Sequence, residues 1–286
     1  MSAKIIDGKE IANKIKESLK EEIEILKKRG NPPSLSAIQV GENPGSKVYV
    51  RAQRKSCESM GIEYNLHQFN EDVTQEDLLN FIQKLNRDKK VSGIILQMPL
   101  PSNLNARALQ RTIDPKKDAE GISPTNMGEV VYGKPVLGPC TAMAIMEIIN
   151  SLKINLYGKE AVMVGHSDIV GKPTALLLLD KFVTTSVCHI ATGERGSLPS
   201  YVRNAEILIV AVGKANLIKG EWIKEGAVVI DVGINRVEGK IVGDVEFEAS
   251  KEKASYITPV PGGVGPVTTA MLLKNTVEAA KIQANR

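Results

Sequence analysis

A short strand-like segment followed by a turn recurs four times in the second half of the chain, and this recurrence limits the fold more than any other feature. The four segments are residues 160–164, 184–189, 206–212 and 227–232. They consist mainly of Val, Ile, Thr and Ala, and the last two end at Gly213 and Gly233. Segments of this kind, separated by helical stretches, are typical of strands that a parallel sheet buries on both faces. The sequence therefore predicts an α/β domain with a Rossmann-like sheet, the type that binds dinucleotides.

A glycine-bearing loop follows the first of these strands. It runs from Gly165 to Pro173, reads G-H-S-D-I-V-G-K-P and leads into a helix. Ser167 stands where the G-x-G-x-x-G fingerprint has its second glycine, so the match to that motif is incomplete. Ile169 likewise excludes the nucleophile elbow of serine hydrolases, which needs a glycine there. Two interpretations remain: a loop that holds a cofactor phosphate, and a tight strand-to-helix turn without a ligand.

The first half of the chain shows the same alternation of strands and helices. Strands are expected at residues 35–40, 62–69 and 91–97, and helices at residues 8–29, 46–60 and 74–88. Asp7 and Ser46 stand where a side chain can accept hydrogen bonds from the first free amides of a helix. Gly61 is placed to end the second helix.

Polar residues of this half are candidates for a site. Tyr49 and Gln53 are four residues apart on the second helix, so they share one of its faces. Gln97 comes at the carboxyl end of a predicted strand, where ligands collect in parallel sheets. Asp118 and Glu120 lie in a polar loop. The alternatives are a solvated helix face with one half-buried tyrosine, and loop carboxylates that only face water.

The length of the chain and a proline-rich hinge indicate two domains. A chain of 286 residues exceeds one ordinary hydrophobic core, and residues 135–141 are rich in Pro and Gly. The expected boundaries are residues 1–140 plus 268–286 for one domain and residues 141–267 for the other. The last segment is a helix that is expected to return to the first domain.

Composition excludes several classes of protein. The 37 basic and 33 acidic residues are interspersed and only 4% of residues are aromatic, which argues against nucleic acid as a partner. Three well-separated cysteines fit a reducing compartment, and no apolar run approaches the length of a membrane helix. We therefore expect a cytoplasmic protein without a membrane segment. His166 and His189 have no further ligands at metal-binding spacing, so no metal site is expected.

Four motifs together resemble one family. They are Y-x-x-x at Tyr49, L-Q-M-P-L-P at residues 96–101, V-G-H-S-D-I-V-G-K-P at residues 164–173, and P-V-P-G-G-V-G-P-V-T at residues 259–268. With these motifs the chain resembles the methylenetetrahydrofolate dehydrogenase/cyclohydrolase family over essentially its whole length. The resemblance implies two α/β domains with folate in the cleft between them, NADP or less often NAD on the second domain, and a homodimer. It also implies two reactions, hydride transfer from methylenetetrahydrofolate to the nicotinamide and hydrolysis of the methenyl product to formyltetrahydrofolate.

The resemblance also assigns candidate residues. Those expected to act in catalysis are Tyr49, Gln53, Gln97 and Glu120. Those expected to bind the substrate are Tyr49, Gln97, Pro99, Glu120, Pro261, Gly262 and Gly263. Those expected to bind the cofactor are Gly165, His166, Ser167, Ile169, Val170, His189, Ile190, Val212, Gly213, Gly233 and Ile234.

Four positions depart from the family pattern. Gln53 stands in place of the catalytic lysine, and Glu120 in place of the second aspartate of D-V-D-G. His166 replaces the arginine of G-R-S, and Ile190 replaces a serine that, with that arginine, holds the 2′-phosphate of NADP.

These departures predict an altered enzyme. Glutamine cannot exchange a proton, and the loss of a general acid or base typically removes about 10²–10⁴ in rate. An intact dehydrogenase with weak or lost cyclohydrolase activity is therefore expected. Because histidine is only partly charged near neutral pH and isoleucine donates no hydrogen bond, NAD is favoured over NADP.

Two alternatives stay open at this point. One is the full bifunctional NADP-dependent enzyme, in which Glu120 or a bound water takes over the proton transfer. The other is a relative that binds folate without catalysis. Lys55 and Arg54 are further candidates to replace the lysine, although neither shares the helix face of Tyr49.

Overall fold

The computed structural model describes residues 2–285, except the side chains of residues 44–48. It divides into two compact units. The six-stranded unit comprises residues 1–12 and 141–268, and the three-stranded unit comprises residues 13–140 and 269–286. The first residues thus group with the second half of the chain, whereas the sequence had placed all of residues 1–140 together. The reason is a two-residue strand, Lys4–Ile5, that pairs with Tyr256–Ile257.

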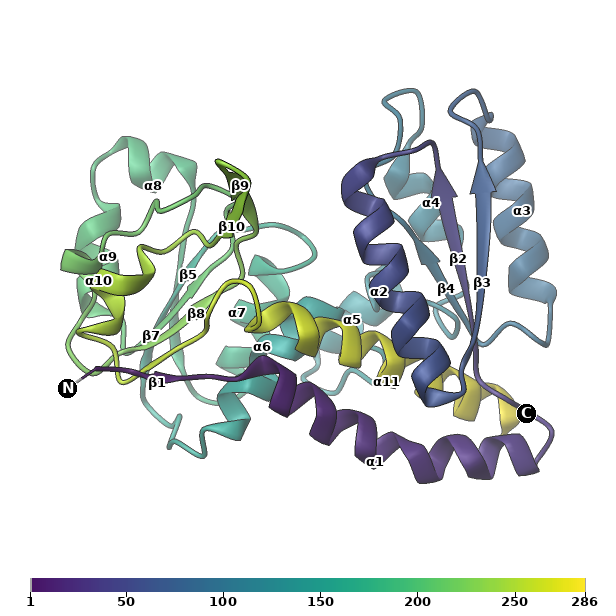
Figure 1. Ribbon diagram of the computed structural model, residues 1–286, viewed down its shortest axis with the longest axis horizontal. Coiled ribbons are helices and arrows are strands. Elements are labelled where there is room, and N and C mark those ends of the chain that lie inside the picture. Colours follow the sequence, from purple (N-terminus) through teal and green to yellow (C-terminus); the bar gives the residue numbers. More distant parts are fainter. Residues whose placement is uncertain (1, 286) are drawn as a thin grey trace. The chain divides into compact units, whose positions relative to one another are not determined.

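The six-stranded unit is built on a parallel sheet with the strand order β1-β11-β8-β7-β5-β6 (Figure 1). The strands are β1 (Lys4–Ile5), β5 (Glu160–Val164), β6 (Thr184–Cys188), β7 (Ile207–Val210), β8 (Val228–Asp231) and β11 (Tyr256–Ile257). In register, Val164 of β5 is paired with both Cys188 of β6 and Val210 of β7. The chain leaves β5 in one direction and crosses back to β7 on its other side. Parallel sheets bind ligands at such a switch point, beyond the carboxyl ends of the strands.

Helices flank the sheet of this unit. They are α6 (Cys140–Ser151), α7 (Gly171–Leu179), α8 (Ile190–Glu194), α9 (Leu198–Asn204), α10 (Phe247–Lys251) and the 3₁₀ turn η1 (Gly220–Trp222). Leu198 and Val202 of α9 pack with Val162, Leu208 and Val229 in one hydrophobic core. The helix α7 lies on the opposite face (Figure 1), as two right-handed crossovers require.

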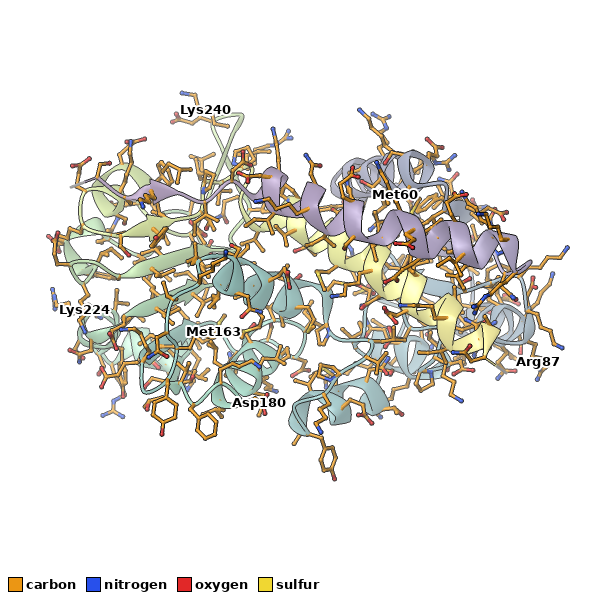
Figure 2. The ribbon with its side chains drawn as sticks, turned by 90° about the horizontal axis from the view of Figure 1, so that it is seen from below. Met60, Arg87, Met163, Asp180, Lys224 and Lys240 are labelled. Atoms are coloured by element: carbon orange, nitrogen blue, oxygen red, sulfur yellow. The ribbon has the colours of Figure 1, made fainter. Side chains whose placement is uncertain are left out.

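A hairpin of β9 (Asn235–Val237) and β10 (Lys240–Val242) projects from the six-stranded unit. Figure 2 shows Lys240 near its tip, pointing away from the sheet, while Met163 lies within the body of the unit. This hairpin was not expected from the sequence, because strands of three residues are too short to show a clear alternation.

The three-stranded unit contains a parallel sheet with the order β3-β2-β4. Its strands are β2 (Ser34–Val40), β3 (Glu63–Phe69) and β4 (Gly93–Leu96), and its helices are α2 (Pro44–Met60), α3 (Gln75–Arg87), α4 (Ala106–Thr112) and α5 (Pro124–Val131). The long helices α1 (Gly8–Lys28) and α11 (Val264–Ala284) each carry a unit boundary. The helices α2 and α3 lie on opposite faces of the sheet (Figure 1).

Alternation along the strands decides which side chains face α3. Ile38 and Val40 of β2 and Ile94 and Leu96 of β4 form a core with α3 and α4. Because successive side chains of a strand point to opposite faces, Gln97 is directed to the other face, the side of α2.

The helix ends test several capping predictions. Asp7 Oδ1 accepts hydrogen bonds from the backbone N–H groups of Lys9 (2.8 Å) and Glu10 (3.3 Å), which confirms Asp7 as a cap. Gly61 has a φ of 67° just after α2, as expected for the residue that ends a helix. The helix α2 begins at Pro44, two residues before the expected start. The predicted cap by the Ser46 side chain lies outside the described residues.

Candidate functional site

One face of the three-stranded unit brings two predicted site residues into direct contact. Gln97 Nε2 donates a hydrogen bond to Gln53 Oε1 over 2.7 Å. Gln97 is buried at the end of β4 and Gln53 is partly buried on α2, so the strand end and the helix face meet at these amides. Tyr64 of β3 adds a second donor, because its hydroxyl lies 3.2 Å from the same oxygen.

Tyr64 was not among the residues selected from the sequence. Burial raises the pKa of its phenol, so the hydroxyl stays protonated and can donate. The Arg54 guanidinium lies 5.4 Å from the centre of the Tyr64 ring. Arg54 therefore stacks on this ring rather than replacing a lysine at Gln53.

Tyr49 is more exposed than the predicted residues Gln53 and Gln97 beside it. Its side chain is 51% exposed, and partial burial raises the pKa of the phenol. A half-exposed ring at the start of α2 is available for stacking on a flat ligand. Pro99 follows a cis peptide bond with Met98 just beyond β4.

The loop that carries Glu120 is fixed by Asp118. Asp118 is buried, and its carboxylate accepts hydrogen bonds from the backbone N–H of Gly121 (3.0 Å), the backbone N–H of Ser123 (2.6 Å) and Asn126 Nδ2 (3.0 Å). Burial and then the nearby Asp118 charge raise the pKa of Glu120 to about 8. Glu120 is thus suited to hold a proton near neutral pH, whereas Asp118 serves the loop.

Lys117 anchors the other end of this loop. It is 5% exposed, and its Nζ donates to the backbone carbonyls of Leu85 (3.0 Å) and Asp88 (2.6 Å) at the end of α3. A buried ammonium is tolerated there because the last carbonyls of a helix need donors.

The six-stranded unit places the predicted cofactor residues at the carboxyl edge of its sheet. Gly165 follows β5 with a φ of 120°, and a side chain there would collide with the Ala211 carbonyl. Ser167 Oγ accepts hydrogen bonds from the N–H groups of Val170 (3.2 Å) and Gly171 (3.4 Å), which shapes the turn into α7. The hydroxyl at the place of the missing glycine thus serves the loop itself.

Two histidines face each other at this edge. The rings of His166 and His189 are 5.4 Å apart, and Ile190 beside them is 77% exposed. Ile169, Val212 and Ile234 are also exposed, although each is a large apolar side chain. Exposed apolar side chains gathered at a strand edge are suited to cover the flat rings of a dinucleotide.

The loops after β7 and β8 are held by two buried aspartates. Val212 and Gly213 donate their backbone N–H groups to Asp244 Oδ2 over 2.7 and 3.0 Å. Gly233 donates to Asp231 Oδ1 over 2.9 Å. Burial raises the pKa of Asp231 to about 6, against the opposing effect of its backbone hydrogen bonds.

The proline-rich loop that carries Pro261, Gly262 and Gly263 also belongs to the six-stranded unit. The Val260–Pro261 peptide bond is cis, and Gly262 has a φ of 108°. Gly8 donates its N–H to the Gly262 carbonyl over 3.0 Å, and a side chain at Gly8 would collide with the Gly263 carbonyl. The start of α1 therefore holds this loop, which explains a close backbone approach at Gly8.

The sequence missed four residues that build these sites: Tyr64, Lys117, Asp231 and Asp244. Tyr64 and Asp231 lie in or at the end of strands, and no local pattern distinguishes them from ordinary strand residues. Asp244 lies in a loop between glycine and valine, where an aspartate is usually solvated.

The parallel sheet, its switch point and the loops around it define a dinucleotide-binding α/β enzyme. Residues 139–284 match the tetrahydrofolate dehydrogenase/cyclohydrolase NAD(P)-binding domain, and residues 6–120 match the catalytic domain of the same family. The chain belongs to the tetrahydrofolate dehydrogenase/cyclohydrolase family, and it is an enzyme of that family.

Similar proteins support this assignment along the whole chain. The "Bifunctional protein FolD" of Acetivibrio thermocellus is 51% identical over 285 residues, which is 99% of each chain. The crystal structure of the bifunctional FolD enzyme of Campylobacter jejuni is similar, with a TM-score of 0.95, 46% identity and coverage of 98% of this chain and 99% of that one. The Trypanosoma brucei enzyme, solved with NADP and an inhibitor, has a TM-score of 0.95 and 39% identity over the full length of both chains.

The part of the chain that the structure describes contains neither a membrane-spanning helix nor a cluster of metal ligands. No helix between residues 2 and 285 is long and apolar enough to cross a membrane. Among the side chains that the structure describes, no group of three or more His, Cys, Asp or Glu residues is placed to hold a metal ion.

Proposed function

We propose that this protein oxidises 5,10-methylenetetrahydrofolate to 5,10-methenyltetrahydrofolate with a nicotinamide dinucleotide as hydride acceptor. The observation that carries the proposal is the set of loops at the switch point of the six-stranded sheet, in a chain whose family is defined by this chemistry. The residues present fit the cofactor. The exposed side chains of Val212, Ile190 and Ile234 offer apolar cover for its rings.

Hydride transfer requires position more than acid or base catalysis. The bound dinucleotide supplies the hydride chemistry, and the protein supplies binding and orientation. In this proposal Tyr49 stacks on the folate, Gln97 and Glu120 hold its polar edge, and Pro99 completes the contacts made by the three-stranded unit. The loops at Gly165–Val170, His189–Ile190, Val212–Gly213 and Gly233–Ile234 hold the dinucleotide.

The second reaction of the family, hydrolysis of the methenyl product, is expected to be weak. Gln53 occupies the position of the family lysine, and its carbonyl oxygen already accepts hydrogen bonds from Gln97 and Tyr64. An amide held in this way can orient a ligand but cannot exchange a proton.

A second candidate is the full bifunctional enzyme that yields 10-formyltetrahydrofolate. The names of the similar proteins favour it, because the Acetivibrio and Campylobacter proteins are called bifunctional. Glu120 gives this candidate a chemical basis, since burial and Asp118 raise its pKa to about 8 and allow it to carry a proton at neutral pH.

NAD is the proposed cofactor, because two side chains are poorly suited to hold the 2′-phosphate of NADP. His166 and Ile190 occupy the positions that hold the 2′-phosphate of NADP in the family pattern, and Ile190 can donate no hydrogen bond. The Trypanosoma structure with NADP does not favour NAD, so a direct comparison of the two cofactors is needed. A homodimer and a cytoplasmic location remain proposals from the family resemblance. Light scattering on the purified protein tests the former.

The decisive experiment measures both reactions on one preparation. Reduced nicotinamide should appear when methylenetetrahydrofolate is added with NAD, and more slowly with NADP. Methenyltetrahydrofolate should accumulate rather than disappear. Absence of cofactor reduction with both dinucleotides would refute the dehydrogenase. Rapid loss of added methenyltetrahydrofolate, abolished by Tyr49→Phe, would select the bifunctional candidate.

A further inference from the structure

Two buried aspartates lie among the loops at the carboxyl edge of the six-stranded sheet. Asp231 ends β8 and is 4% exposed, and Asp244 follows β10 and is fully buried. A buried carboxylate is costly unless hydrogen bonds satisfy it. The donors that satisfy these two carboxylates come mostly from the backbone of the candidate cofactor loops.

Asp244 binds the backbone of the loop after β7 through its carboxylate. Its Oδ2 accepts from the N–H groups of Val212 and Gly213, and its Oδ1 accepts from the N–H of Lys214 over 2.8 Å. Three successive amides thus converge on one side chain. The fourth donor is Asn235 Nδ2, at 2.9 Å from Oδ1, at the start of the β9–β10 hairpin.

Asp231 ties Asp244 to the neighbouring loops. Its Oδ1 accepts from the N–H groups of Gly233 (2.9 Å) and Asp244 (3.0 Å), and its Oδ2 accepts from the N–H of Val245 (2.9 Å). The backbone N–H of Asp231 donates to Thr258 Oγ1 over 2.8 Å. Thr258 directly precedes the proline-rich loop, so the network reaches that loop as well.

Two glycines show how closely this network is packed. A side chain at Gly233 would collide with the Asp244 carboxylate, and one at Gly243 would collide with the Asp231 carboxylate. Neither glycine has a positive φ, so space and not backbone conformation explains them. The segments around both aspartates are therefore fitted to each other.

We propose that Asp244, supported by Asp231, is a positioning residue for the nicotinamide cofactor. It acts by fixing the backbone of residues 212–214, a loop that lies beyond the carboxyl end of β7 at the switch point of the sheet. The inference rests on the proposed function only for the identity of the ligand.

A carboxylate is required at this position, because both of its oxygen atoms accept hydrogen bonds, whereas an amide has only one accepting oxygen. In Asp244→Asn the amide NH₂ would face at least one pair of N–H donors, and the loop would lose at least one hydrogen bond to a charged group. The loss of a hydrogen bond of this kind should weaken the binding of a ligand that depends on the loop by about 10- to 100-fold. The turnover number with saturating cofactor should change far less, because no reacting group is removed.

The test compares cofactor binding by three full-length variants, with NADH and NADPH as probes followed by their own fluorescence. Asp244→Asn should raise the dissociation constant of the preferred cofactor about 10-fold or more. Asn235→Ala removes only the side-chain donor and should raise it about threefold. Glu246→Gln is the matched control. This carboxylate also holds a loop, through the N–H of Gly220 and Lys219 Nζ, and neither of these two partners lies in a candidate cofactor loop.

The outcomes separate a positioning role from a purely structural one. The proposal is supported if the dissociation constant of the cofactor rises in Asp244→Asn and Asn235→Ala but not in Glu246→Gln. The Michaelis constant for the cofactor should rise as well, while the turnover number stays nearly unchanged. The proposal is overturned if a folded Asp244→Asn binds the cofactor as tightly as the wild-type protein does. It is also overturned if Glu246→Gln weakens cofactor binding as much as Asp244→Asn. If Asp244→Asn does not fold, Asn235→Ala decides, and unchanged binding by that variant overturns the proposal. A wild-type protein that binds NADH or NADPH but oxidises no methylenetetrahydrofolate would refute the proposed function and leave this inference standing.

Discussion

Restoring a lysine at Gln53 should create or strongly increase hydrolysis of methenyltetrahydrofolate. The variant Gln53→Lys places an amine where the Gln53 amide now lies, between the Gln97 amide and the Tyr64 hydroxyl. Both partners can adapt, because Gln97 can turn its amide to present Oε1 and the phenol oxygen of Tyr64 can accept. Arg54, stacked on the Tyr64 ring, adds a positive charge that favours the neutral amine. The new side chain can therefore exchange protons near neutral pH.

The size of the effect follows from general acid–base catalysis. A positioned proton-transfer group contributes about 10²–10⁴ in rate, and the lower end applies to a variant whose surroundings were shaped around glutamine, so about 100-fold is expected. Reduction of the nicotinamide should change by less than about threefold, because hydride transfer needs no protein base.

The assay follows the loss of methenyltetrahydrofolate absorbance after subtraction of the buffer rate, beside reduction of the nicotinamide. Gln53→Met is the matched control, since it has similar length and no exchangeable proton, and it should show no gain. A wild-type protein that already hydrolyses methenyltetrahydrofolate as fast as Gln53→Lys, or an equal gain in Gln53→Met, would contradict the prediction.

Three further predictions concern other residues of the two units. Because the pKa of Glu120 is raised, its contribution to stability is complete below about pH 4.5 and is lost as the pH rises through about 8. The loss should be of the order of 2 kcal/mol after allowance for solvent, and Glu120→Gln should remove most of it. Urea unfolding between pH 5 and 8.5 measures this, and a pH dependence that is the same in the variant would contradict the prediction. The double variant His166→Arg with Ile190→Ser should raise the ratio of kcat/KM for NADP to that for NAD by about 10-fold or more, because it supplies charge-assisted donors; a wild-type protein that already prefers NADP by that factor would end the argument. Lys117→Met should lower the free energy of unfolding by about 2–4 kcal/mol through the loss of two hydrogen bonds to α3, whereas the exposed neighbour Lys116→Met should leave it nearly unchanged.

The sequence predicts the long, periodic elements well, because each carries its own signal. The strand expected at residues 160–164 has these bounds in the structure, and the strand expected at 35–40 and the helices expected at 8–29 and 74–88 agree with β2, α1 and α3 to within one residue at each end. The strands β1 and β11 have two residues each, which is too short for any periodicity. Their pairing joins residues far apart in the sequence, and it makes the first residues part of the six-stranded unit.

The candidate sites were predictable only in part, for a similar reason. Helical spacing placed Gln53 on the face of Tyr49, and the strand end placed Gln97 at an edge, but their contact depends on packing between α2 and β4. Tyr64 joins them from a strand whose side chains gave no sign of a site. Asp231 and Asp244 are far from their partners along the chain, so no local pattern indicates that their carboxylates hold the cofactor loops.

The pairing of β1 with β11 also has a consequence for biosynthesis. The ribosome makes the edge strand Lys4–Ile5 long before Tyr256–Ile257, the strand with which it pairs in the sheet. Neither unit is a continuous stretch of chain, since α11 supplies the end of the three-stranded unit. We therefore expect that neither unit completes its folding while the rest of the chain is still being made, unlike the usual case of an amino-terminal domain. Both units are completed only after α11 has been made, and a nascent chain stopped before residue 256 would carry an unpaired β1.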